Sequence, residues 1–326
     1  MKRMRYMILA VVALLAAGCE KVVEFEVGDQ EQRVVVNSMV SADSTVSIKL
    51  SYSRFFLEGN YWNSTFPTID NATVELLRNG NAETVALVGG GVYQSNCRPN
   101  PGDELKLKVM VPGKKTVESS CRVPVRADFE VVDFVVDTVS GYRGDVKCRL
   151  RLKMNDKGGE RNYYRVEVRG WTSGWDDDLR MEVPIRTWMT LMSSDPVFNV
   201  DMGLEEVLDG GVENEVWGRA LDFDDQLFDG GSHVLTVNFE YYDYLWYESE
   251  RFVMTPMDYP LEIYVGSISE ELYRYSQTRD AAESDDLLAF FAEPVQVYCN
   301  IKNGLGIFAS KTTTKKKLQP RYAVLN

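Results

Sequence analysis

The chain has 326 residues, of which 36 are lysine or arginine and 49 are aspartate or glutamate, so its formal net charge is −13. This length exceeds that of one small β-sandwich and predicts two hydrophobic cores. The acidic excess argues against nucleic acid or anionic lipid surfaces as partners, because both require concentrated lysine and arginine. His233 is the single histidine, so several imidazoles cannot assemble a zinc site, and no catalytic motif is present. We therefore expect no metal, no cofactor and no enzymatic activity.

The first 18 residues have the pattern of a lipoprotein signal peptide. Basic residues precede an apolar run at 7–17, which is shorter than the roughly 20 residues of a membrane-spanning helix. Small residues then lead to Gly18-Cys19, and a cysteine directly after such a segment is the site that lipoprotein maturation acylates. We expect Cys19 to be the lipidated first residue of a membrane-anchored mature chain. The alternative is an ordinary secreted protein in which Cys19 is incidental.

Residues 19–124 are predicted to form an N-terminal antiparallel β-sandwich of the immunoglobulin-like or transthyretin-like type. About seven short segments alternate apolar with polar residues, as half-buried strands do. Asn79-Gly80 and Pro101-Gly102 supply the turn chemistry between them. The long segment at 54–70 is rich in aromatic residues, among them Tyr61 and Trp62. These aromatics form either a small core or a contact surface, since loops at the end of a sandwich commonly bind ligands.

Residues 125–326 are predicted to form a C-terminal β-rich domain. The clearest strand is at 146–154, where apolar residues alternate with lysine and arginine. His233 lies at the start of a strand-like run and is expected on the surface. Four acidic residues, Asp222, Asp224, Asp225 and Asp229, resemble a calcium loop, but leucine and histidine occupy the EF-hand positions that need glycine and glutamate. A solvated turn is the better interpretation.

The run at 239–252 concentrates aromatic side chains on both faces of a predicted strand. Tyr242, Tyr244 and Trp246 are the candidates for stacking on a sugar or a peptide. The alternative is a strand that packs on both of its faces. A single helix is predicted at about 267–279, where Ser267 and Glu270 have capping-box spacing. Three lysines at 315–317 are expected in a solvated turn or tail, and a binding patch is the alternative.

Four cysteines follow Cys19, and an exported chain meets an oxidising compartment where they can pair. Predicted strand directions place Cys97 and Cys121 at one end of the first sandwich, where we expect a disulfide. Cys148 and Cys299 both face inward on alternating strands of the second domain. They either pair across its core or remain small buried hydrophobic residues.

Several segments in the same order resemble domain-of-unknown-function family 4249. The most visible are residues 268–275, 291–294 and 300–308, and the last of these contains the step Gly304-Leu305-Gly306, which we expect to be a turn between final strands. The family comprises Gram-negative lipoproteins without established catalytic residues. Its members are typically encoded beside TonB-dependent outer-membrane receptors.

The resemblance implies a lipoprotein anchored in the outer membrane, with the cell surface favoured over the periplasm. It further implies an accessory binding component of a nutrient uptake system, with a TonB-dependent transporter as partner and an unknown ligand. The alternative is a structural or adhesin-type surface lipoprotein that binds only protein partners.

Overall fold

The computed structural model describes residues 31–54, 66–140, 145–176, 181–198, 216–242, 246–248, 251–253, 260–283 and 295–319. The predicted fold class is confirmed: the described chain is mainly β, and it has one α-helix, near the C-terminus. Cys19 and the signal segment lie outside the described residues. No helix within the described part is long and apolar enough to span a membrane.

The N-terminal half forms a two-layer sandwich. Its strands are β1 (Val34–Ser41), β2 (Ser47–Tyr52), β3 (Thr73–Arg78), β4 (Asn81–Glu83), β5 (Val85–Gly89), β6 (Val92–Ser95), β7 (Glu104–Met110) and β8 (Val117–Arg122). One layer has the order β1-β2-β6-β5, and the other has the order β4-β3-β7-β8. Alternating apolar residues from both layers meet in one core, which includes Val36, Leu50, Leu105 and Val109.

The second half packs a five-stranded sheet, β14-β13-β16-β10-β9, against part of a nine-stranded sheet. The elements are β9 (Asp128–Ser140), β10 (Asp145–Asn155), β11 (Tyr163–Asp176), β12 (Met181–Trp188), β13 (Leu191–Ser193), the 3-10 helix η2 (Pro196–Phe198), β14 (Val216–Gly218), β15 (Leu221–Asp224), β16 (Ser232–Tyr242), β17 (Trp246–Glu248), β18 (Arg251–Val253), β19 (Leu261–Ile268), α3 (Glu270–Glu283) and β20 (Leu305–Leu318). The predicted strand at 146–154 is β10, and its apolar face lies in the core with β11, β16 and β19.

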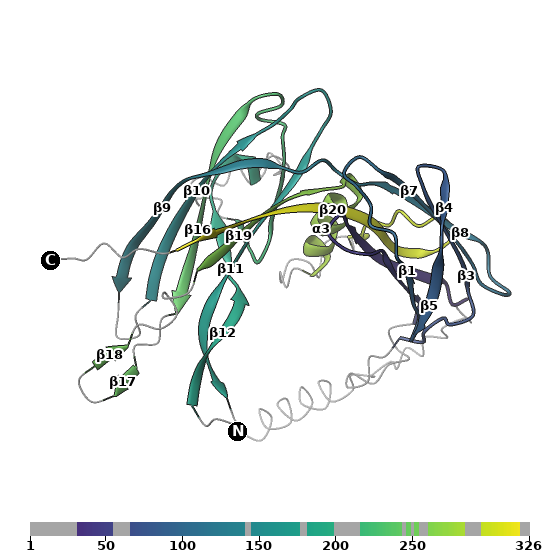
Figure 1. Cartoon of the computed structure of the whole chain (residues 1–326), viewed down its shortest axis with the longest axis horizontal. Coiled ribbons are helices and arrows are strands. Elements are labelled where there is room, and N and C mark those ends of the chain that lie inside the picture. The colour runs from purple at the N-terminus through teal and green to yellow at the C-terminus, as the bar shows by residue number, and fades with distance from the viewer. Residues whose placement is uncertain are drawn as a thin grey trace, which may run out of the picture.

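The last strand, β20, joins the two halves into one continuous sheet (Figure 1). Its C-terminal part pairs antiparallel with β19 from Lys311 to Leu318, and its first part pairs in parallel with β1 from Leu305 to Lys311. The sheet order is therefore β12-β11-β19-β20-β1-β2-β6-β5. The chain thus returns to the first sandwich at its end, where residues 305–311 lie beside β1. The predicted all-antiparallel pairing is wrong for β1 and β20, because these strands are parallel.

Helix α3 starts at Glu270, later than predicted. Ser267 belongs to β19, where it pairs with Thr312 and Tyr164, so the predicted capping box is wrong. Ser269 precedes the helix instead, and its carbonyl accepts the amide hydrogen of Tyr273 at 3.0 Å. Leu272 packs with residues of β19 and β20 in a third, small core, which fixes α3 against the nine-stranded sheet.

Neither expected cysteine pair is formed in the structure, whereas the alternative of a small buried hydrophobic residue holds for Cys148. Cys97 and Cys121 both belong to the first core, but each is a free thiol in the structure, and burial raises the pKa of both. Cys148 lies in the second core, whereas Cys299 packs against the first. Their pairing across a single core is therefore wrong, because residues 295–300 do not form the expected strand of the second domain.

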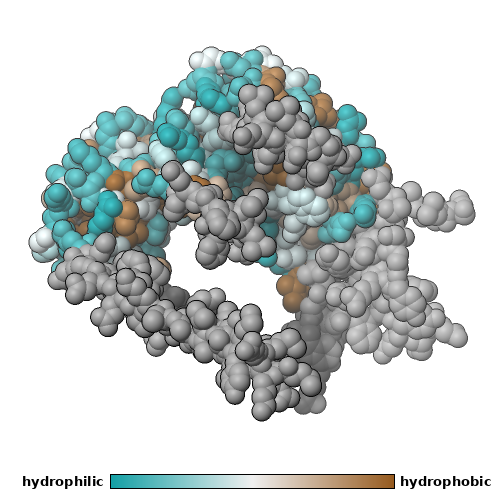
Figure 2. Space-filling view, turned by 180° about the vertical axis from the view of Figure 1, so that it is seen from behind, coloured by the Kyte–Doolittle hydropathy of each residue, from teal (hydrophilic) through white to brown (hydrophobic). Residues whose placement is uncertain are grey.

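The three lysines at 315–317 form no tail. They lie in β20 opposite Tyr264, Ile263 and Glu262 of β19. Figure 2 shows a described surface that is mostly hydrophilic from behind, with hydrophobic residues in small, separate patches.

Candidate functional site

The aromatic residues that the sequence singles out are not brought together among the described residues. Tyr61, Trp62 and Tyr244 lie outside them. Tyr242 is the last residue of β16 and Trp246 is the first residue of β17, but these positions are described by backbone alone. The sugar- or peptide-stacking hypothesis for these five residues stays a prediction.

The acidic turn gathers Asp156, Asp225 and Asp229, whose carboxylate oxygens lie within 4.8 Å of one another. Asp156 accepts hydrogen bonds from the Tyr164 hydroxyl at 2.6 Å and from the amides of Gly158 and Gly230 at 2.7 and 2.9 Å. Asp225 accepts the amide hydrogen of Asn162 at 2.8 Å, and Asp229 accepts that of Gly159 at 3.2 Å. The carboxylates therefore cross-link the loops after β10 and β15, as in a structural turn.

Two carboxylates of this turn have opposite pKa shifts. Burial of Asp156 favours its neutral form, but the hydrogen bonds from Tyr164, Gly230 and Gly158 outweigh burial and lower its pKa. Burial of Asp225 raises its pKa, since its hydrogen bonds with Asn162 do not compensate and Asp156 and Asp229 repel its charge. Asp156 is thus the ionised acceptor around which the turn is organised.

We predict that Asp156→Asn destabilises the protein by about 2 kcal/mol, because an amide nitrogen replaces the oxygen that Gly158 and Gly230 donate to. Asp229→Asn is the matched control and should cost less, since Asp229 is exposed and accepts one amide. The pKa of Asp156 is lower in the folded protein than in the unfolded chain, where it is near 3.9. Its carboxylate therefore stabilises the folded protein above that pH, and this stabilisation is lost as pH falls through the folded-state pKa. Urea unfolding at neutral and acidic pH measures both effects. Equal losses for the two variants at neutral pH would contradict the prediction.

His233 is half-buried, where the sequence predicts a surface position. Its Nε2 lies 2.9 Å from Asp195 Oδ1, and its ring stacks on Phe228 with centroids 5.8 Å apart. Asp195 also accepts the amide hydrogens of Val197 and Thr236. The histidine therefore holds η2 against β16, so its role in the described structure is to stabilise the fold.

A cleft of about 560 Å³ lies between the outer face of β3, β7 and β8 and the residues of α3 and 298–302. Its lysines are each paired with a neighbouring carboxylate. The pairs are Lys106 with Glu104 at 3.1 Å, Lys108 with Glu75 at 3.6 Å and Lys302 with Glu118 at 3.4 Å. A charged ligand in this cleft must compete with these pairs, so the cleft offers little electrostatic attraction.

A second group of side chains lies on the nine-stranded sheet, on the face opposite the second core. We call it the Trp188 cluster, and its members are Arg169, Arg186, Trp188, Glu262, Tyr264, Lys315 and Lys317. Strand register builds it: Trp188 of β12, Arg169 of β11, Glu262 of β19 and Lys317 of β20 form one row across four strands. The intervening residues, such as Val168, Ile263 and Val265, point into the core, so the cluster is held by a rigid sheet.

Glu262 is the anionic centre of the Trp188 cluster and is only 8% exposed. The Tyr264 hydroxyl donates to its carboxylate at 2.6 Å, Lys315 Nζ lies 3.3 Å away, and Arg186 forms an ion pair with it. Trp188 and Tyr264 lie against each other with ring centroids 5.2 Å apart. The Arg169 guanidinium lies 5.1 Å from the Trp188 ring centroid as a cation–π pair.

This arrangement is suited to binding. Aromatic rings and guanidinium groups recognise planar or anionic ligands. Sequence reasoning missed the cluster. The alternation of Leu261, Glu262, Ile263 and Tyr264 shows that two of them face away from the core, but only the topology brings β12 and β20 to their sides.

The described residues define a mainly β protein with sandwich-type packing. Residues 20–317 match the family model described as "Domain of unknown function (DUF4249)", which confirms the resemblance. The chain belongs to this family.

No curated protein matches the chain. Among solved structures, the crystal structure of a DUF4785 family protein from Legionella pneumophila aligns with 10% identity and a TM-score of 0.19. The alignment covers 72% of this chain, which spans about half of that protein (52%). A similarity this low carries no argument about fold or function.

Proposed function

We propose that the protein is a lipoprotein, anchored through Cys19 in the outer membrane and facing the cell surface. In this role it is an accessory binding component of a TonB-dependent nutrient uptake system, and it is not an enzyme. The observation that carries the binding role is the Trp188 cluster, which presents aromatic and cationic side chains on a rigid sheet. Family membership and the signal-like N-terminus support the location and the partner.

Anchoring makes association with a transporter physically easier. Confinement to one membrane raises the effective concentration of the two proteins, so modest contacts suffice. The acidic net charge of −13 disfavours binding to lipid phosphates and leaves the surface available for a protein or a nutrient.

A structural or adhesin-type role is the second candidate, and strand β5 favours it. This strand ends the nine-stranded sheet, has no charged residue and exposes Leu87 and Val88 by 44% and 66%. An uncharged edge strand can accept a strand from a partner protein. Under this alternative the partner is protein alone, and no nutrient binds.

We predict that Cys19→Ala abolishes membrane anchoring, because no other acylation site is expected. Wild-type protein should fractionate with outer membranes and incorporate a labelled acyl chain, whereas the variant should be soluble and unlabelled. Cys299→Ala is the matched control and should behave as wild type, since its thiol packs inside the folded protein. Full membrane retention of unlabelled Cys19→Ala would show that the anchor is elsewhere.

Affinity isolation from gently solubilised membranes tests the partner. A β-barrel transporter should co-purify with wild-type protein and be depleted with Cys19→Ala. If no transporter exceeds the control and deletion leaves nutrient uptake unchanged, the accessory-transport proposal gives way to the structural one. Protease treatment of intact cells tests the orientation, because a surface-facing protein is cleaved without lysis.

A further inference from the structure

Among the described residues, Arg169 has no anionic partner. Its guanidinium lies on the Trp188 ring, and its Nε is buried without a hydrogen-bond acceptor. Among the described residues, this Nε is the one buried side-chain nitrogen or oxygen left unsatisfied. A buried donor without an acceptor costs free energy, and no described carboxylate compensates the guanidinium charge, so the site favours an anionic ligand.

Glu262 is the nearest carboxylate by register, directly opposite Arg169, but it is already neutralised. Arg186, Lys315 and the Tyr264 hydroxyl all engage it. Lys317, on the other side of Glu262 in the same row, is exposed. With Glu167, which lies opposite Tyr264 on the same face, the group has four cationic side chains and two carboxylates, so it is still locally positive in an acidic protein.

The two cations that remain for a ligand are far apart. Arg169 on β11 and Lys317 on β20 are separated by strand β19, so their backbones are roughly 10 Å apart, at two strand spacings. Glu262 lies between them in the row, so a single small anion that touched both cations would face this carboxylate. A chain of sugar units with two carboxylates can place one charge at each cation and an uncharged ring over Glu262, beside the aromatic rings of Trp188 and Tyr264.

We propose that the Trp188 cluster binds an acidic oligosaccharide of the uronic-acid type. One ligand carboxylate binds Arg169, a second binds Lys317, and the sugar between them crosses Glu262 beside Tyr264, whose ring lies against that of Trp188. Arginine suits this position because the N–H groups of its planar guanidinium match the two oxygens of a carboxylate. The Trp188 indole, against which the Arg169 guanidinium lies, holds it in place. This inference rests on the proposed binding role and names its ligand class.

The test is calorimetric titration of the purified full-length Cys19→Ala chain with a uronic-acid trimer. A neutral glucose trimer and inorganic phosphate are the two comparison ligands. We expect the uronic-acid trimer to bind, with affinity that falls as salt rises, and the other two not to bind. Arg169→Gln should weaken binding by about 10- to 100-fold, the value of one or two hydrogen bonds between charged groups.

Two further variants separate binding from folding. Lys317→Gln alters an exposed side chain and should also weaken binding, without a change in melting temperature. Lys106→Gln removes a lysine from the cleft beside β7 and should leave binding unchanged. Absence of trimer binding, equal binding of the neutral trimer, or full affinity in both Arg169→Gln and Lys317→Gln would each overturn the proposal. Since purified protein is used, such a failure leaves the membrane and transporter experiments to be judged separately.

Discussion

Gly306→Ala should destabilise the protein by at least about 3 kcal/mol, although it adds a single methyl group. Gly306 has φ +100°, a conformation that L side chains rarely adopt, and an added Cβ would stand 2.1 Å from the carbonyl oxygen of Val36. Val36 is its register partner in β1, so neither backbone can move without breaking the parallel pairing of β1 and β20. That pairing connects the two halves of the molecule.

Gly113→Ala is the matched control for the Gly306 prediction. Gly113 also has a positive φ, +76°, but an added Cβ there meets no atom within 4 Å. This control therefore isolates backbone strain, which we expect to cost about 1 kcal/mol. Urea unfolding of both variants measures the difference. A similar loss at both positions would show that β1 and β20 tolerate the contact.

These glycines show what the sequence can and cannot predict. The step Gly304-Leu305-Gly306 was expected to be a turn between final strands, but Gly306 is already within β20. Gly304 has its own close neighbours, Ile301 Cγ2 at 2.8 Å and the Val34 carbonyl at 2.9 Å. The glycines allow β20 to approach β1, and this requirement is invisible without knowing that the chain returns to its first strand.

The alternation of apolar and polar residues predicts the strands well, since it depends only on which face of each strand is buried. Residues 146–154 show this, because alternate side chains such as Leu150, Leu152 and Met154 are fully buried. Long-range pairing was not predictable in the same way. Nothing in the pattern of residues 305–318 indicates that β20 pairs with β19 and β1 at once.

The candidate site depends on that long-range pairing. Arg169, Trp188, Glu262 and Lys317 come from four strands, and their row exists only because β11 and β20 flank β19. The aromatic run at 239–252 was more visible because its residues are consecutive in the sequence. A search for consecutive aromatics therefore misses a binding face that is built across a sheet.

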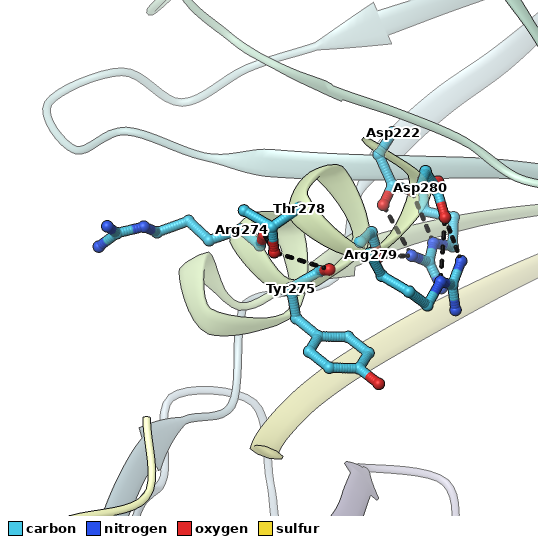
Figure 3. A network of polar contacts seen from close by, with 8 residues as sticks. Asp222, Arg274, Tyr275, Thr278, Arg279 and Asp280 are labelled. Atoms are coloured by element: carbon cyan, nitrogen blue, oxygen red, sulfur yellow. Dashed lines mark hydrogen bonds and ion pairs between the residues drawn. The ribbon is translucent and has the colours of Figure 1, made fainter. Parts of the chain in front are cut away.

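Arg165→Ala should destabilise the protein by about 3–5 kcal/mol, because it leaves a buried carboxylate without its partner. Arg165 of β11 binds Asp222 of β15 with two hydrogen bonds of 2.6 Å, and its guanidinium also donates to Ser276 of α3 at 2.7 Å. The two side chains are 15% and 6% exposed. In Figure 3, Asp222 lies beside the end of α3 that carries Arg279 and Asp280. The pair thus ties β15 and α3 to the sheet.

Two comparisons test whether the loss comes from the unpaired charge. Arg122→Ala breaks an exposed pair with Glu160, whose side chains are 65% and 61% exposed, and should cost less than about 1 kcal/mol. The double variant Arg165→Met, Asp222→Leu removes both charges and should recover much of the stability, because apolar residues of similar size replace a buried pair well. Urea unfolding of the wild type and these three variants measures the stability change of each. If Arg165→Ala costs no more than Arg122→Ala, the pair does not anchor α3, and the third core around Leu272 holds the helix on the sheet.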